Sequence, residues 1–167
     1  VLAHAPPRFA VAGVSLGGYV ALEIIRQAPE RVQRVALFGT RASMRMRPRT
    51  VAEQGLLATA PHAAPTLTPI VSGPVQTMAE RVGTAVFERQ QRAMLARPDI
   101  SAAIAAVRVP TLVAVGEHDR ICLPSDARDL SDHIAGSHFH EIRNCGHLAP
   151  LERPGEVTQL LRDWLQS

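Results

Sequence analysis

Aromatic residues, cysteines and long apolar runs are all scarce in this chain. Aromatics make up 4% of the 167 residues, so the core must be built mainly from Val, Leu, Ile, Ala and Met. The longest apolar runs, around Ala10–Val14 and Thr111–Val115, have the length of strands, which argues against a membrane-spanning helix. Two cysteines, Cys122 and Cys145, are too few for a disulfide framework, and their spacing fits no metal site. We therefore expect reduced thiols in a cytoplasmic protein with no membrane partner.

An excess of acidic residues is also missing, since the formal net charge is +3. The positive excess comes largely from Arg41, Arg45, Arg47 and Arg49, with no aromatics between them and no nucleic-acid motif in the chain. A basic balance without such a motif is weak evidence for nucleic acid, so we expect a solvated surface here and no nucleic-acid partner. Hydrophobic residues at 46% and charged residues at 20% are typical of a globular protein of one domain.

Short apolar segments alternate with helical patterns along the chain. The first segment, Phe9–Val14, is followed at once by a helical pattern that ends before Pro29. The predicted apolar face of that helix consists of Leu16, Val20, Ile24 and Ala28. Because Val35–Phe38 is a second buried strand, these elements form a βαβ unit with a parallel sheet, which places the chain in the α/β class. The other predicted elements are strands at Thr111–Val115 and His138–Ile142 and helices at Pro124–Ile134 and Gly155–Leu165.

The pattern is looser between residues 41 and 107. Several prolines keep any helices in its first part short, and the clearest helical segment runs from about Val75 to Leu95. The predicted inward positions of this segment are Met78, Val82, Val86 and Phe87. An insertion of this length between two strands is typical of a cap that selects substrate. We therefore divide the chain into a nucleophile-bearing part of the core (1–40), a helical cap (41–107) and a second part of the core (108–167).

A Gly-x-Ser-x-Gly pattern stands between the first predicted strand and the first predicted helix, where residues 13–17 read Gly-Val-Ser-Leu-Gly. In a nucleophile elbow the serine sits on a sharp, strained turn, so that its hydroxyl stands clear of the backbone. Small flanking residues let the turn pack tightly, and the helix N-terminus after the serine favours negative charge. Because the strand and the helix are both predicted, the pattern indicates that Ser15 is a nucleophile and not an ordinary turn residue.

A serine needs a base within reach, oriented by an acid, before it attacks a carbonyl. After the third predicted strand, residues 116–119 read Gly-Glu-His-Asp, and after the fourth, residues 144–147 read Asn-Cys-Gly-His. These positions make Asp119 the candidate acid and His147 the candidate base. The chain order of serine, acid and histidine differs from the orders in trypsin-like and subtilisin-like enzymes.

Other candidates for these roles are weaker. The position directly after Val35–Phe38 can also carry an acid, but it holds Gly39 and Thr40 and no carboxylate. Cys145 has no base of its own and is expected to pack as a small hydrophobe. His138 and His140 share one face of a strand, but no third metal ligand is evident, so no metal is expected. Asp119 as a helix-capping carboxylate and His147 as a surface histidine remain the plain alternatives.

With these motifs in place, the chain resembles the C-terminal two-thirds of an α/β-hydrolase of the enol-lactonase and carboxylesterase-like branch. The resemblance covers Phe9 to Leu37, Arg97 to Asp119 and Asn144 to Pro154. It implies a cofactor-free hydrolase that cleaves small-molecule esters or lactones through an acyl-enzyme. Haloalkane dehalogenases and epoxide hydrolases of this fold place Asp where this chain has Ser15, so the resemblance argues against those activities.

The same resemblance implies parts of the fold that this chain does not contain. A full member of the family has further strands before the position of Phe9 and a His-Gly-type loop that supplies one amide of the oxyanion hole. Within this chain only the amide of Leu16 is expected in that role, and loss of one such donor costs about 100- to 1,000-fold in rate. The strand Phe9–Val14 is then an edge with unpaired backbone groups. We expect it to pair with a missing N-terminal segment or with a second copy.

Two alternatives to an esterase or lactonase stay open. In the first, the chain is an incomplete, non-catalytic half-domain that associates through its exposed strand. In the second, the same three residues support acyl transfer or hydrolysis of a carbon–carbon bond. The identity of the substrate is not predicted, because the expected cap is rich in proline and poor in pattern.

Overall fold

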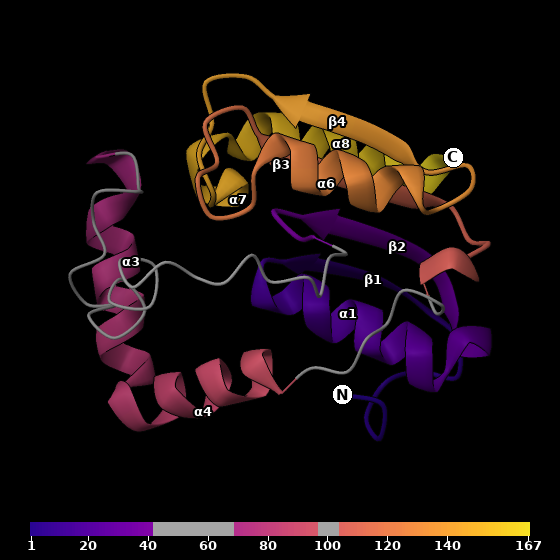
Figure 1. The fold of residues 1–167 in the computed structure, drawn as a ribbon, viewed down its shortest axis with the longest axis horizontal. Helices are drawn as coiled ribbons and strands as arrows, with labels where there is room; N and C mark the ends of the chain where they lie inside the picture. Colours follow the sequence, from indigo (N-terminus) through magenta and orange to yellow (C-terminus); the bar gives the residue numbers. More distant parts are fainter. Residues whose placement is uncertain (42–68, 97–103) are drawn as a thin grey trace. The chain divides into compact units, whose positions relative to one another are not determined.

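Four parallel strands form one sheet in the computed structural model, which describes residues 1–41, 69–96 and 104–167 (Figure 1). The strands are β1 (Phe9–Val14), β2 (Val32–Phe38), β3 (Thr111–Gly116) and β4 (His138–Ile142). Their order in the sheet is β1-β2-β3-β4, and each neighbouring pair is parallel. The predicted α/β class is confirmed. Among the described residues β1 has a strand partner on one side only, so it is an edge of this sheet.

The carboxyl ends of the strands lie at one edge of the sheet. Val14 pairs with Phe38, and Phe38 in turn pairs with Ala114. The segments that follow β1, β2 and β3 therefore begin close together, which is where parallel α/β sheets carry their sites. Every residue of β3 is buried, as expected of a parallel strand that is covered on both faces.

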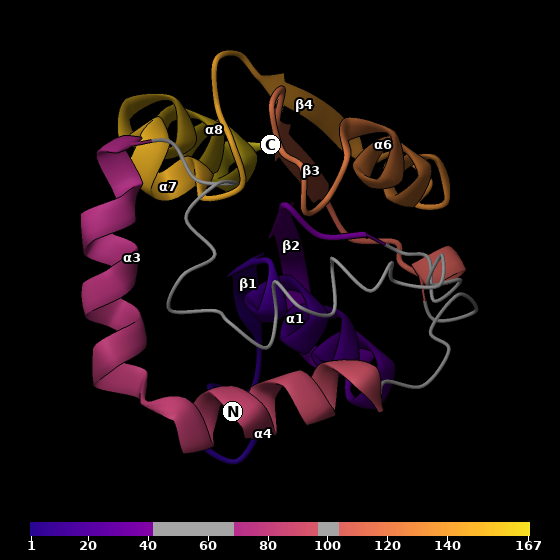
Figure 2. The ribbon, with the colours of Figure 1, turned by 60° about the vertical axis from the view of Figure 1, so that its left-hand side comes forward.

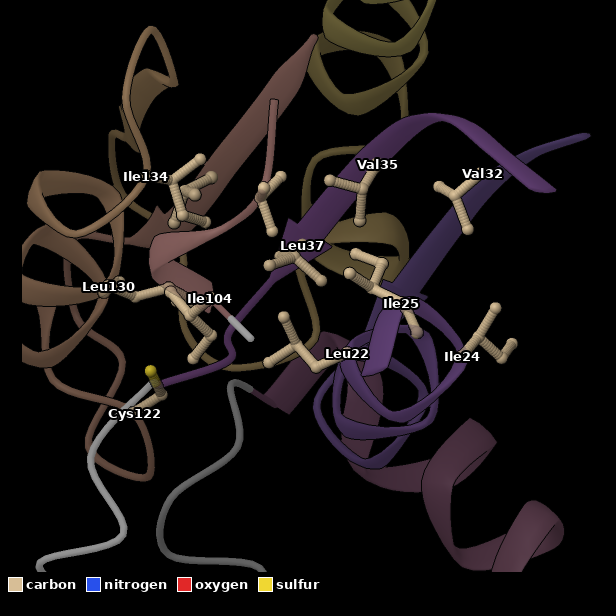
Figure 3. Close-up of a cluster of buried hydrophobic side chains, with 14 of the residues drawn as sticks. Leu22, Ile24, Ile25, Val32, Val35, Leu37, Ile104, Cys122, Leu130 and Ile134 are labelled. Carbon is tan, nitrogen blue, oxygen red and sulfur yellow. The ribbon is translucent and has the colours of Figure 1, made fainter. Parts of the chain in front are cut away.

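Helices cover both faces of this sheet. In Figure 2, α6 and α8 lie on opposite sides of β3 and β4. The helices are α1 (Leu16–Gln27), η1 (Pro29–Arg31), α6 (Pro124–Asp132), α7 (Ala149–Glu152) and α8 (Pro154–Gln166). One core cluster joins the sheet to α1 and α6 through residues such as Leu22, Leu37 and Leu130 (Figure 3). A second cluster joins it to α8 through Val157 and Trp164.

The buried face of α1 differs from the predicted one. Val20 is 42% exposed, and the deeply buried residues include Ala21, Leu22 and Ile25. A strict four-residue spacing drifts around a helix that has 3.6 residues per turn, so it does not mark a single face over three turns. Ile24 and Ala28, also predicted on that face, are buried.

Residues Met44–Asp99 form a compact unit apart from the unit made by Val1–Ser43 and Ile100–Ser167. Its described part consists of α3 (Pro69–Val82) and α4 (Thr84–Leu95). The predicted helical segment from Val75 to Leu95 is helical except at Gly83, which has φ +74, outside the helical region, and separates the two helices.

The predicted inward face of this segment is wrong in part, because Met78 is 54% and Val82 39% exposed. Arg45, Arg47 and Arg49 lie outside the described residues. The role of residues 41–107 as a cap stays a prediction. Among the residues that the structure describes, none of the helices combines the length and the hydropathy of a membrane span.

Candidate active site

Ser15 occupies a strained turn between β1 and α1. Its backbone has φ +50 and ψ −112, a left-handed φ that a residue with a side chain rarely adopts. The turn is held by the Ser15 N–H, which donates to the Phe38 carbonyl at 2.8 Å, and by the Gly18 N–H, which donates to the Ser15 carbonyl at 3.0 Å. The Ser15 hydroxyl does not cap α1 and makes no hydrogen bond to the described residues. The strained backbone therefore carries a Ser15 hydroxyl that no structural hydrogen bond occupies.

The two glycines of the Gly-x-Ser-x-Gly pattern do different things. A Cβ on Gly13 would overlap the backbone of Gly17 and Gly18, so only glycine fits where β1 enters the turn. A Cβ on Gly17 would have no neighbour within 4 Å. The tight packing expected on both sides of the serine is found at Gly13 before it and at Gly18 after it, where a Cβ would overlap the Thr40 side chain. Gly17 itself borders open space.

Asp119 and His147 form a buried pair on the turns that follow β3 and β4. His147 Nδ1 lies 2.8 Å from Asp119 Oδ2, and the two residues are 6% and 2% exposed. The other carboxylate oxygen, Oδ1, accepts hydrogen bonds from the backbone N–H groups of Ile121 and Cys122 at 2.8 and 2.9 Å. A carboxylate only accepts, so Nδ1 carries a proton, and in the neutral ring the lone pair is on Nε2. Such an imidazole is prepared to accept a proton at Nε2.

The turns that carry this pair are bonded to each other. The His118 N–H donates to the Cys145 carbonyl at 2.8 Å, and the Asn144 N–H donates to Glu117 Oε2 at 2.8 Å. A Cβ on Gly116 would overlap the backbone of Cys145 and Gly146, so the turns touch directly. The acid and the histidine are therefore fixed by backbone contacts as well as by their own hydrogen bond.

Gly39, the residue directly after β2, lies where the serine turn meets the acid and the histidine. It has φ +55, and a Cβ placed on it would lie 3.1 Å from His147 Nδ1 and 3.2 Å from Asp119 Oδ2. The preceding residue, Phe38, accepts the hydrogen bond from Ser15. All three predicted site residues thus gather at the carboxyl edge of the sheet. Asp119 and His147 are joined directly, whereas no hydrogen bond joins Ser15 to His147 in the described part of the chain.

Two residues at this edge were not indicated by the sequence, Gly39 and Glu152. From the sequence, Gly39 is only a position without a carboxylate. Glu152 is a buried residue of α7 that accepts hydrogen bonds from the backbone on both sides of His147. The signal in the sequence is a carboxylate five positions after the candidate base, and a lone Glu in a helical pattern is usually solvated.

Neither thiol can replace the serine hydroxyl. Burial raises the pKa of Cys145 to about 12, and the negative charge of Glu152 raises it further. Burial likewise raises the pKa of Cys122 to about 12, with Asp119 as the next contributor. Both cysteines are free and buried, and a protonated thiol is a poor nucleophile. Cys145 packs in the core cluster beneath α8, as the sequence predicted.

The described residues contain no group of three His, Cys, Asp or Glu side chains that could hold a metal ion. His140, one of the pair considered as ligands, instead places Nε2 2.9 Å from Glu156 Oε1 on α8. What the edge of the sheet offers is a strained serine, a buried histidine–carboxylate pair and a helix N-terminus. These groups are suited to acyl transfer by a nucleophilic hydroxyl.

Comparisons with known proteins agree with this fold. A model of the alpha/beta hydrolase family matches residues 1–160. A thermophilic esterase from Thermogutta terrifontis superimposes with a TM-score of 0.80 at 30% identity, over 96% of this chain and 65% of the esterase. The enol-lactonase from Burkholderia xenovorans LB400 gives 0.76 at 25% identity, over 96% of this chain and 66% of that chain.

A shorter match links the chain to a peptidase. The proline iminopeptidase of Lactobacillus crispatus is 39% identical over 59 residues, which are 35% of this chain and 20% of the peptidase. The chain thus spans about two thirds of the length of the two solved structures and a fifth of the peptidase.

Proposed function

The chain belongs to the alpha/beta hydrolase family, and on that premise we propose that it cleaves carboxylic esters or lactones through an acyl-enzyme. Ser15 is the nucleophile, His147 the base and Asp119 the acid that orients it. The observation that carries the proposal is the buried His147–Asp119 hydrogen bond, which fixes a proton on Nδ1 and leaves Nε2 as the site for proton transfer, at the edge of the sheet where Ser15 stands.

In the first half of the proposed reaction, Ser15 Oγ attacks the substrate carbonyl while His147 Nε2 takes the hydroxyl proton. The carbonyl oxygen becomes an oxyanion, and the N–H of Leu16 at the start of α1 stabilises it. The intermediate collapses when the carbon–oxygen bond to the alcohol breaks and Nε2 returns its proton to the leaving oxygen. In the second half, water attacks the acyl-enzyme and gives a proton to Nε2. The bond between the acyl carbon and Ser15 Oγ then breaks, and Nε2 returns the proton to Oγ, which releases the acid and the free serine.

Turnover of p-nitrophenyl acetate tests this proposal, with the 167-residue chain and the protein from its complete reading frame measured in parallel. We expect a burst of p-nitrophenol equal to the enzyme concentration, followed by slower turnover, because p-nitrophenolate is a good leaving group, which makes acylation faster than deacylation. Ser15→Ala should remove the burst. Equal bursts from the wild type and Ser15→Ala would contradict the assignment.

The type of bond is the finer part of the proposal. Relatives that include an esterase, an enol-lactonase and a proline iminopeptidase support ester and lactone cleavage and leave peptide bonds as the nearest competitor. A panel of matched esters, lactones and amides, with and without an alcohol acceptor, separates hydrolysis from acyl transfer. A substrate that loses a carbon–carbon bond completes the panel, since the same triad supports that reaction.

A second candidate function rests on β1. Among the described residues β1 is an edge strand, and an unpaired edge offers its backbone N–H and C=O groups to another strand. We propose that this edge pairs with an N-terminal segment or with a second copy of the chain. If the chain is only a binding half-domain, it elutes as a dimer or complex and shows no burst. An active monomer contradicts that alternative.

A cytoplasmic location, in keeping with two free thiols, is part of the proposal.

A further inference from the structure

Glu152 is a buried carboxylate whose two oxygens hold the backbone on either side of His147. Oε2 accepts the N–H of Gly146 at 2.8 Å, and Oε1 accepts the N–H of Leu148 at 3.0 Å. The residue is 7% exposed. Each oxygen thus bonds one neighbour of the candidate base, and the histidine lies between the two anchored peptide groups.

Helix capping explains only half of this arrangement. Leu148 is the residue before α7, and a Glu near the start of a helix often accepts the N–H of the capping residue. The bond to Gly146 reaches two residues further back, outside α7, and has no role in capping. A Cβ on Gly146 would lie 3.0 Å from Oε1, so the peptide before His147 packs against the carboxylate itself.

The burial of the Glu152 carboxylate indicates a functional role for this residue. No cation forms an ion pair with Glu152 among the described residues, and an unpaired buried carboxylate is costly to remove from water. A neutral side chain would cap a four-residue helix with less desolvation. The carboxylate is the group that satisfies two N–H donors at once, one on each side of a single residue.

We propose that Glu152 is a positioning residue that fixes the backbone of His147, so that Nε2 stays aligned with Ser15 through proton transfer. The inference rests on the proposed function of Ser15 and His147. Asp119 orients the ring from its Nδ1 side, and Glu152 orients the main chain from which the ring projects. Two independent restraints thus act on one imidazole, and the second acts through backbone atoms.

Glu152→Gln is the sharpest variant, because it keeps the size of the side chain but turns one acceptor into an amide donor that faces an N–H. We expect the kcat and the labelling rate with a fluorophosphonate to fall about 10- to 100-fold, with little change in KM, since small misplacements of a base have such effects. Glu152→Asp keeps the charge but is shorter by one methylene, and it should recover part of the loss. Both rates are expressed per folded molecule, with the folded fraction measured by circular dichroism.

Glu156→Gln is the matched control, because Glu156 is an exposed carboxylate on α8 that bonds His140 and not the His147 turn. It should label at the wild-type rate. Equal labelling of wild type, Glu152→Gln and Glu152→Asp per folded molecule would overturn the positioning role, and so would a loss that follows only the folded fraction. If Glu152→Gln does not fold, Glu152→Asp carries the same comparison. A wild type that is not labelled, or Ser15→Ala that is, would instead refute the proposed function itself.

Discussion

Two histidine–carboxylate pairs of nearly equal length show what distinguishes a catalytic candidate from a surface contact. His147 Nδ1 lies 2.8 Å from Asp119, and His140 Nε2 lies 2.9 Å from Glu156. The side chains of the first pair are 7% and 0% exposed, and those of the second are 33% and 40% exposed. Distance therefore does not separate the two pairs, whereas burial does.

The surroundings of the two carboxylates differ as well. Asp119 is saturated by two backbone N–H groups in addition to the histidine, which fixes its rotamer. Glu156 has no further hydrogen bond among the described residues and faces solvent. A carboxylate that is held from both sides can impose one tautomer on its histidine, and a loosely held one cannot.

The largest expected effect comes from breaking the buried pair. In Asp119→Asn, the Asn oxygen still accepts the N–H groups of Ile121 and Cys122, and its NH₂ group faces His147. Nδ1 must then accept, which moves the proton to Nε2 and removes the base. We expect kcat to fall about 10,000-fold with the fold intact, measured by ester turnover and circular dichroism. A loss below tenfold would mean that Asp119 does not set the tautomer.

The next effect concerns the reactivity of the two thiols, Cys122 and Cys145, which are buried near the His147–Asp119 pair. Burial raises the pKa of both thiols from 9.0 to about 12, so at pH 8 the thiolate fraction is about 1,000-fold lower than in an unfolded chain. Ellman's reagent should react slowly with Cys122 and Cys145 in the folded protein and at once in denaturant. Fast reaction of the folded protein would show that water reaches this interior.

Gly39→Ala should have a smaller effect on rate. The added Cβ approaches the His147 ring and the Asp119 carboxylate, so we expect about a 100-fold loss of kcat from misalignment. Its left-handed backbone costs an additional ~1–2 kcal/mol of stability. Gly136→Ala is the control, because Gly136 has φ +76 but no atom within 4 Å of the added Cβ. If both variants lose stability and activity alike, strain and not contact with the pair explains the result.

The smallest effect is expected at the exposed pair. Glu156→Gln removes the partner of His140, and an ion pair in solvent contributes below about 1 kcal/mol to stability. Chemical denaturation should give nearly the wild-type midpoint, and ester turnover should be unchanged. A large loss of stability or of turnover would contradict the claim that only the buried pair is important.

Local pattern was sufficient to predict most of the sheet. The strands Phe9–Val14 and His138–Ile142 have the predicted bounds, and Ser15 follows the first of them on the expected strained turn. β2 begins at Val32 and not at the predicted Val35. The prediction started too late because the polar, exposed Gln33 interrupts the apolar pattern, although the strand runs through it. These successes depend on residues that are close in sequence, where period and turn chemistry are informative.

The missed features depend on contacts between distant segments. Gly39 matters because a Cβ there would crowd His147, and Glu152 matters because it bonds the turn after β4, neither of which a local pattern contains. The break at Gly83 was missed because a single glycine inside a helical pattern is tolerated in many helices. The pairing of Asp119 with His147 was predicted through chain order, and its burial and tautomer required the structure.

The site of covalent modification by a fluorophosphonate tests the central claim most directly. Peptide mass spectrometry of the labelled wild type should find one adduct on the peptide that contains Ser15. The adduct should be absent in Ser15→Ala and strongly reduced in His147→Gln. An adduct on another serine, or equal labelling of the Ser15→Ala variant, would contradict the account.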